Sequence, residues 1–278
     1  MNTINQLFST LFSSLDKSLY SLLDKSIFVN ENVLSDSFFY SIFQDSFGLP
    51  TIANALLIGF AIYYCFRLSF SHFSGNNVEK PYQFLTKLLL VAICINCSAF
   101  ICEEILNITG LITDSLKELG KHITGQEVSF HNLISKSIYL GSDSNSFNLF
   151  SIEGILKSFF SFGLISLLFS YSIRYILIKI FILLSPFSFL SLVNNSTSWF
   201  FRTWSRTFFS LLFVQIFVVL ILILLFSISI QSTNLFSQIS YISTIFILSK
   251  ANSYVRELIG GLSLDINTNI LSIKNLIK

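Results

Sequence analysis

The central part of the chain, residues 155–193, has the sequence ILKSFFSFGLISLLFSYSIRYILIKIFILLSPFSFLSLV. Only three of these thirty-nine residues are charged, namely Lys157, Arg174 and Lys179. The hydrocarbon core of a bilayer is about 30 Å thick, which about 20 apolar helical residues can cross. A helix over residues 155–185 would be about 46 Å long at about 1.5 Å per residue, which exceeds one straight crossing. The stretch is therefore predicted to be embedded in a membrane.

The composition of the whole chain is typical of the same class. Of its 278 residues, 53% are hydrophobic and only 12% are charged, whereas soluble domains have about 25% charged residues. The apolar residues form continuous runs and not the alternating segments of about ten residues that build a membrane β-barrel. The predicted fold class is therefore all-α: a polytopic α-helical membrane protein with about five transmembrane helices and additional interfacial amphipathic helices.

The apolar runs and the polar stretches between them divide the chain into segments. The first two transmembrane helices are expected in residues 46–102, where the second helix would end at Glu103 and Glu104. Residues 154–249 are expected to hold the central long helix, an interfacial Trp/Arg segment and the last two transmembrane helices. The other segments are 1–45, an amphipathic outer-face segment; 103–153, an extracytoplasmic polar and amphipathic cap; and 250–278, a cytoplasmic amphipathic tail.

The first 28 residues repeat apolar side chains at spacings of three and four, which predicts an amphipathic helix. The apolar stripe of this helix needs a partner. That partner is either the headgroup region of the bilayer or a neighbouring subunit.

The distribution of charge predicts how the chain is oriented. With five crossings, one side carries nine basic and three acidic residues, and the other carries five basic and twelve acidic residues. Lysine and arginine favour the cytoplasmic side. We therefore expect the chain to lie in the cell membrane with its N-terminus outside the cell and its C-terminus in the cytoplasm. The five-crossing count requires residues 175–193 to be tilted, re-entrant or interfacial. The alternative is six crossings, which would put Arg202 and Arg206 on the opposite side from the turn at Arg67–Lys87.

Arg174 and Lys179 are the most informative polar residues of the central stretch. As anchors, they would extend towards the phosphates at the membrane boundary. As functional residues, they would face the interior of the bundle and line a hydrated path for an anionic substrate. Arg67, Gln215 and Pro186 complete the candidate pore or interface residues, although an amide such as Gln215 more often bonds across helices than lines a pore.

Two further groups of residues have expected roles. Two Trp and two Arg residues within eight positions are typical of an interfacial helix whose rings lie at headgroup level; they are Trp199, Arg202, Trp204 and Arg206. Small residues that allow helices to approach closely are Gly163, Ser166 and Ser170.

No pattern indicates catalysis. The chain has no P-loop, no G-x-S-x-G and no H-E-x-x-H motif. Cys94 and Cys97 form a C-x-x-C spacing, but they lie in an apolar run, which favours a packing role over a redox pair. We expect no enzymatic activity, no cofactor and no metal site.

Several strings, in this order and spacing, resemble one family over nearly the whole chain. They are residues 59–67 (GFAIYYCFR), 71–75 (SHFSG), 78–84 (VEKPYQF), 149–163, 185–191 (SPFSFLS), 198–202 (SWFFR) and 251–261 (ANSYVRELIGG). Together they resemble the TrbL-type polytopic membrane proteins of conjugative type IV secretion systems, in the form found on mobile elements of low-GC Gram-positive bacteria.

The resemblance implies a channel or scaffold subunit that helps move relaxase-linked single-stranded DNA across the cell membrane. The expected partners are the lipid bilayer, other type IV secretion subunits including a VirB-type ATPase, further copies of the chain, and transiently the DNA–relaxase substrate. The alternative functions are a small-solute permease or a membrane assembly factor.

Overall fold

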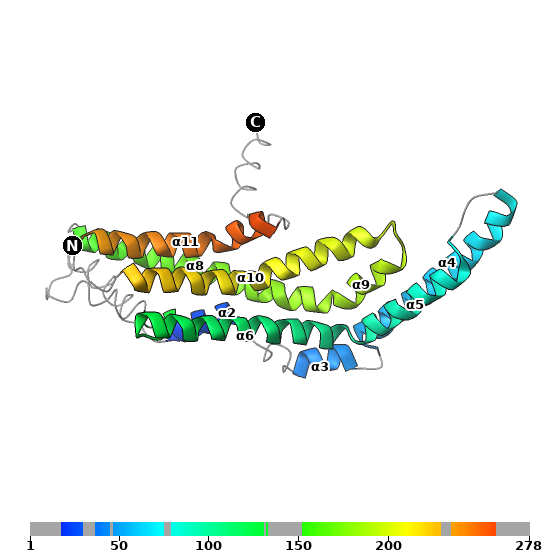
Figure 1. Cartoon of the computed structure of the whole chain (residues 1–278), viewed down its shortest axis with the longest axis horizontal. Coiled ribbons are helices and arrows are strands. Elements are labelled where there is room, and N and C mark those ends of the chain that lie inside the picture. Colours follow the sequence, from blue (N-terminus) through cyan, green and yellow to red (C-terminus); the bar gives the residue numbers. More distant parts are fainter. Residues whose placement is uncertain are drawn as a thin grey trace, which may run out of the picture. The chain divides into compact units, whose positions relative to one another are not determined.

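The structure is a computed structural model that describes residues 18–29, 37–44, 47–74, 79–130, 132, 152–228 and 235–259. All regular elements within these ranges are helices (Figure 1). They are α2 (Ser18–Ile27), α3 (Ser37–Gln44), α4 (Leu49–Ser74), α5 (Pro81–Asn96), α6 (Ser98–Thr124), α8 (Ile152–Leu183), α9 (Ser185–Leu190), the 3₁₀-helix η2 (Ser191–Val193), α10 (Ser198–Ile228) and α11 (Leu235–Ile259). The predicted all-α class is confirmed for the described residues.

Three of the described helices are long and apolar enough to cross a membrane. The segments that meet this criterion are Leu49–Ser71 of α4, Phe162–Leu183 of α8 and Ser198–Ser227 of α10. Helices α5 and α6 meet it together, although they are bent by 64° at their junction, so the number is four if this pair forms one span. Helix α11, in which the last crossing was expected, is not among them. Five crossings and the orientation of the termini stay predictions.

Two proline residues lie at helix starts. Pro81 is the first residue of α5 and Pro186 is the second residue of α9, and in the first turn of a helix the missing backbone N–H of proline leaves no hydrogen bond unmade. Helix α8 continues through Tyr175 to Leu183, so the first half of the stretch 175–193 is a direct extension of the central helix.

Three helix boundaries differ from the expected ones. The break expected at Glu103 and Glu104 lies at Cys97, and α6 runs through both carboxylates. A charged side chain does not by itself end a helix. Helices usually end at a capping residue, a glycine or a proline. The Trp/Arg segment is likewise the first part of the continuous helix α10, and α11 continues past Lys250 to Ile259. Of the predicted helix over residues 1–28, only α2 lies within the described residues.

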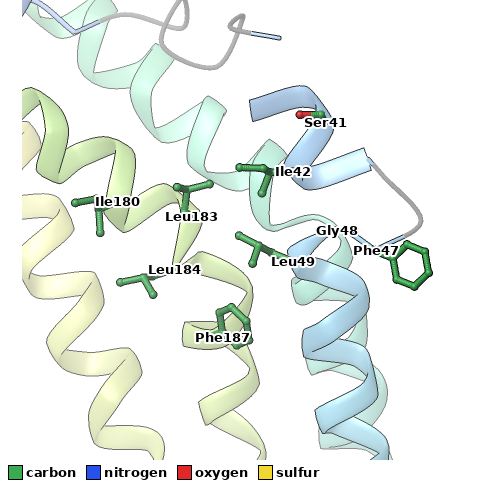
Figure 2. Close-up of a pocket in the computed structure, with 9 residues that line it drawn as sticks. All are labelled: Ser41, Ile42, Phe47, Gly48, Leu49, Ile180, Leu183, Leu184 and Phe187. Carbon is green, nitrogen blue, oxygen red and sulfur yellow. The ribbon is translucent and has the colours of Figure 1, made fainter. Parts of the chain in front are cut away.

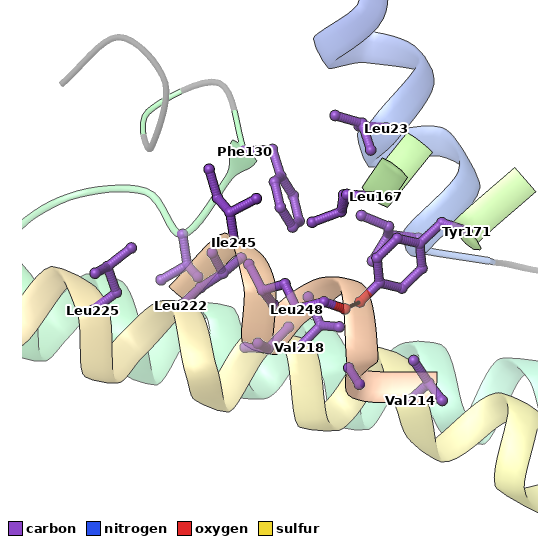
Figure 3. Close-up of a cluster of buried hydrophobic side chains, with 14 of the residues drawn as sticks. Leu23, Phe130, Leu167, Tyr171, Val214, Val218, Leu222, Leu225, Ile245 and Leu248 are labelled. Carbon is purple, nitrogen blue, oxygen red and sulfur yellow. Dashed lines mark hydrogen bonds between the residues drawn. The ribbon is translucent and has the colours of Figure 1, made fainter. Parts of the chain in front are cut away.

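The chain forms two compact units. The first comprises residues 1–29, 109–176 and 210–278, and the second comprises residues 30–108 and 177–209. The core of the first unit gathers buried side chains from α2, α8, α10, α11 and the segment after α6 (Figure 3). The core of the second unit lies between α4, α5 and α9, around Ala53, Ile95 and Phe189. Each core is assembled from segments that are distant in the sequence.

Candidate functional site

Arg174 lies inside the first unit and is only 1% exposed, the largest side chain among those that are almost completely buried. Its Nε donates a hydrogen bond to the carbonyl oxygen of Leu211 in α10 at 2.7 Å. Its Nη1 donates to the carbonyl oxygen of Ile27, the last residue of α2, at 2.8 Å. Arg174 therefore joins three helices through backbone carbonyl groups.

Gln215 makes a second polar contact with the same end of α2. Its Oε1 accepts a hydrogen bond from the backbone N–H of Val29 at 3.2 Å, and its side chain is 1% exposed. Leu211 and Gln215 are one turn apart on α10, so they lie on the same face of that helix. Two residues predicted separately from the sequence are thus brought together around residues 27–29.

The electrostatic environment explains why these partners suit a buried cation. The last four carbonyl groups of a helix lack intrahelical partners, and the C-terminal end of a helix carries a partial negative charge. The guanidinium group of Arg174 satisfies one such carbonyl at the end of α2. Its Nη2, however, is buried and has no hydrogen-bond partner.

Other contacts hold α2 against the first unit. Leu23 and Ile27 are buried in its core beside Phe130 and Leu167 (Figure 3). The carboxylate of Asp24 accepts a hydrogen bond from the backbone N–H of Phe130 at 3.3 Å. The apolar stripe of α2 therefore packs within its own chain, whereas the sequence suggested the headgroup region or a neighbouring subunit as its partner.

The neighbouring turn of α8 packs on α11. The hydroxyl of Tyr171 donates to the carbonyl oxygen of Leu248 at 3.0 Å (Figure 3). The amide Nδ2 of Asn252 donates to the hydroxyl oxygen of Ser170 at 2.8 Å. Sequence reasoning did not select Tyr171 or Asn252. A signal was present, because both are polar residues within predominantly apolar helices and Tyr171 lies one turn before Arg174.

The other candidate pore residues lie in the second unit. The Nζ of Lys179 lies 5.3 Å from the centre of the Phe39 ring, which is a cation–π geometry. Arg67 is exposed on α4, and Pro186 is buried at the start of α9. The five candidates are thus divided between two units, and their pore role stays a prediction.

The predicted interfacial anchors occupy the first turns of α10. Trp199 is 63% exposed, and Arg202 and Arg206 are also exposed. Trp204 is 5% exposed, and its indole Nε1–H donates to the carbonyl oxygen of Phe181 at 2.8 Å. Trp204 is therefore packed inside the second unit, with its N–H bonded to a protein acceptor, whereas the other three residues face outward.

The predicted packing residues on α8 have different surroundings. A Cβ atom on Gly163 would lie 2.6 Å from the Cγ2 atom of Ile245 in α11, so the two helices approach closely at this point. Ser170 contacts Asn252 of α11, as described above. Ser166 is exposed.

An open groove in the second unit has a volume of about 610 Å³ (Figure 2). Its walls include Ile42 of α3, Leu49 of α4, Leu183 and Leu184 of α8, and Phe187 of α9. These side chains are apolar, so the groove can hold hydrocarbon but offers no cation to an anionic substrate.

Metal ligands do not gather among the described residues, where no group of three His, Cys, Asp or Glu side chains could hold an ion. The four cysteines are free thiols.

Comparisons with known proteins do not identify the chain. It matches no protein-family model, no curated protein and no solved structure. The resemblance to TrbL-type proteins therefore stays a prediction that is based on the strings quoted above.

Proposed function

We propose that the chain is a multi-pass membrane subunit of a conjugative type IV secretion system. The observation that carries the membrane part of this proposal is the apolar outer surface of the spanning helices. On α4, Ile58, Phe66 and Phe70 are each more than 60% exposed. Contiguous apolar surface of this kind on several helices is costly in water and is the normal outer surface of a protein in lipid.

The helices α4 and α5 illustrate this argument. They contact each other through the stacked rings of Tyr64 and Phe84, with ring centres 3.8 Å apart, and through a hydrogen bond from Asn54 to Asn96 of 3.0 Å. Apolar side chains such as Ala53 and Ile95 are buried in the core that the two helices share, and Leu85 and Leu89 on the outer side of α5 are exposed. Large apolar side chains therefore lie on the outer surface as well as in the core, whereas the outer surface of a soluble helical hairpin is mostly polar.

The DNA-transfer part of the proposal is supported by the resemblance. Several of the resembling strings fall on described helices, including residues 59–67 on α4 and residues 198–202 at the start of α10. The finer proposal has five crossings, an external N-terminus and a cytoplasmic C-terminus. The subunit would assemble with a VirB-type ATPase, other membrane subunits and copies of itself, and would help move relaxase-linked single-stranded DNA without catalysing a reaction.

The topology is tested by adding an epitope tag at each end of the chain and measuring whether antibody reaches each tag in intact cells and in opened cells. The proposal expects the N-terminal tag to be accessible from outside and the C-terminal tag only after the membrane is opened. A chain that alkaline carbonate washes out of the membrane would contradict the membrane part of the proposal. Two tags accessible from the same side would contradict the odd number of crossings.

The DNA-transfer function is tested by deleting the gene from its mobile element and measuring the frequency of conjugation. We expect transfer to be lost and to return when the chain is supplied in trans. A neighbouring gene for a VirB-type ATPase and another for a relaxase are also expected. Normal transfer without the chain would refute the function, and solute uptake by the chain alone in vesicles would favour a permease.

A further inference from the structure

The C-terminal end of α2 and the side chain of Arg174 depend on each other chemically. Without α2, Arg174 would keep its hydrogen bond to Leu211 and lose its bond to Ile27. Since Nη2 has no acceptor either, two of its three nitrogen atoms would be unpaired. A buried cation in that state is strongly destabilising unless water reaches it or its surroundings rearrange.

Helix α2 depends on the same contacts. Its described part, Ser18–Ile27, packs Leu23 and Ile27 into the core of the first unit, and most of the stability of a helix in a protein comes from such packing. Its stability therefore comes from docking, through its apolar face and through Arg174 and Gln215 at its C-terminal end. Both of these hydrogen bonds involve backbone groups of residues 27–29.

We infer that α2 reversibly covers a polar site formed by Arg174 and Gln215 inside the first unit. When α2 is docked, its terminal carbonyl group neutralises the cation in part and its apolar residues exclude water. When α2 leaves, Arg174 and Gln215 become accessible to water within an otherwise apolar bundle. Because Nη2 has no partner in the docked state, docking stabilises the protein less than a full set of hydrogen bonds would, and release of α2 costs correspondingly less free energy. This inference does not depend on the proposed function.

The test measures how fast a water-soluble maleimide labels a cysteine placed at Val29, which is 1% exposed. Cys65, Cys94 and Cys97 are first replaced by serine, and the same protein without the new cysteine gives the background. Labelling of a buried position reports the fraction of molecules in which the segment is released. The full-length protein is used, in membranes.

Arg174→Met and Gln215→Leu should each accelerate labelling by about tenfold or more, because each removes a buried hydrogen bond to the last residue of α2 or to Val29 just after it. Arg174→Lys should have an intermediate effect, since it keeps the charge but cannot reach two carbonyl groups in the same way. Tyr171→Phe is the matched control. It removes a buried hydrogen bond one turn away, but that bond goes to α11, so labelling at position 29 should not change.

The reciprocal experiment releases α2 directly and reads the site. Leu23→Asp introduces a carboxylate into the core. A cysteine at position 211, which is 2% exposed and whose bond to Arg174 uses the backbone carbonyl, should then become reactive, whereas Leu23→Met should leave it protected. If Arg174→Met prevents accumulation of the protein, Gln215→Leu and Leu23→Asp decide the outcome. Protection of position 29 in every variant, or equal acceleration by Tyr171→Phe, would overturn the inference.

Discussion

Gly163 of α8 lies directly against Ile245 of α11, so closely that a Cβ atom on the glycine would be 2.6 Å from the Cγ2 atom of the isoleucine. Ile245 is 1% exposed. Glycine has no side chain and therefore permits the closest approach of two helices. The absence of a side chain at position 163 is therefore a structural requirement of this helix contact.

Gly163→Ala is expected to lower the free energy of unfolding by about 1–3 kcal/mol, because the added methyl group overpacks the contact with Ile245. Denaturation in detergent micelles, followed by circular dichroism, measures the change. Ile245→Ala should destabilise the glycine variant less than it destabilises the unchanged protein, since it also removes the Cγ2 atom that would clash.

The control for this prediction is Gly110→Ala in α6, where nothing lies within 4 Å of the new Cβ atom. This change should raise stability by about 0.5–1 kcal/mol, since glycine is unfavourable inside a helix. Equal effects at positions 163 and 110 would contradict the close contact between α8 and α11.

The two tryptophan residues should be distinguishable by fluorescence. A Trp204→Phe variant retains only Trp199, which is 63% exposed, and a Trp199→Phe variant retains only Trp204, which is 5% exposed. In vesicles of brominated lipid, we expect strong quenching of Trp199 and weak quenching of Trp204, because quenching requires contact with the lipid. Equal quenching would show that both rings face the bilayer, as an interfacial segment with two anchoring rings would require.

The contact between Ser170 and Asn252 should contribute a measurable coupling energy. The amide Nδ2 of Asn252 lies 2.8 Å from the Ser170 hydroxyl and 3.3 Å from its carbonyl oxygen. A double-mutant cycle with Ser170→Ala and Asn252→Ala should give about 0.6 kcal/mol, with an upper value of about 1.7 kcal/mol, as for other hydrogen bonds between membrane helices. Strictly additive effects of the two changes would refute the contact.

The ion pair between Glu79 and Lys87 should contribute much less to the free energy of unfolding than its short distance suggests. The two charged groups are 2.7 Å apart, but both side chains are 39% exposed. We expect Glu79→Gln to cost about 0–1 kcal/mol of stability, and we expect that cost to shrink as salt is added, because salt screens exposed charges. A large cost that is independent of salt would show that this pair lies away from solvent.

Much of the fold can be predicted from local features of the sequence. The continuous apolar runs predict helices, and Pro81 and Pro186 mark the starts of α5 and α9 because proline suits the first turn of a helix. The helix boundary expected at Glu103 and Glu104 was less predictable. A pair of acidic residues shows where a helix meets a polar environment but does not by itself interrupt the backbone.

The candidate site was predictable only in part. Arg174 and Gln215 are conspicuous as polar residues within apolar helices, and their selection needed no structure. Their meeting at the end of α2 could not be foreseen, because the groups that they bind are the backbone carbonyl of Ile27 and the backbone N–H of Val29. Backbone groups are the same at every residue, so a sequence pattern cannot mark them as partners.

The sequence by itself determined that this chain is helical, poor in charge and apolar enough to enter a membrane, because these properties depend on composition and on the spacing of residues along one helix. Only the tertiary structure decided that Arg174 is buried and that Trp204 faces inward. Their hydrogen-bond acceptors, in Ile27 and Phe181, are 147 and 23 residues away along the chain. Contacts over such separations arise from packing of whole helices, which local spacing does not encode.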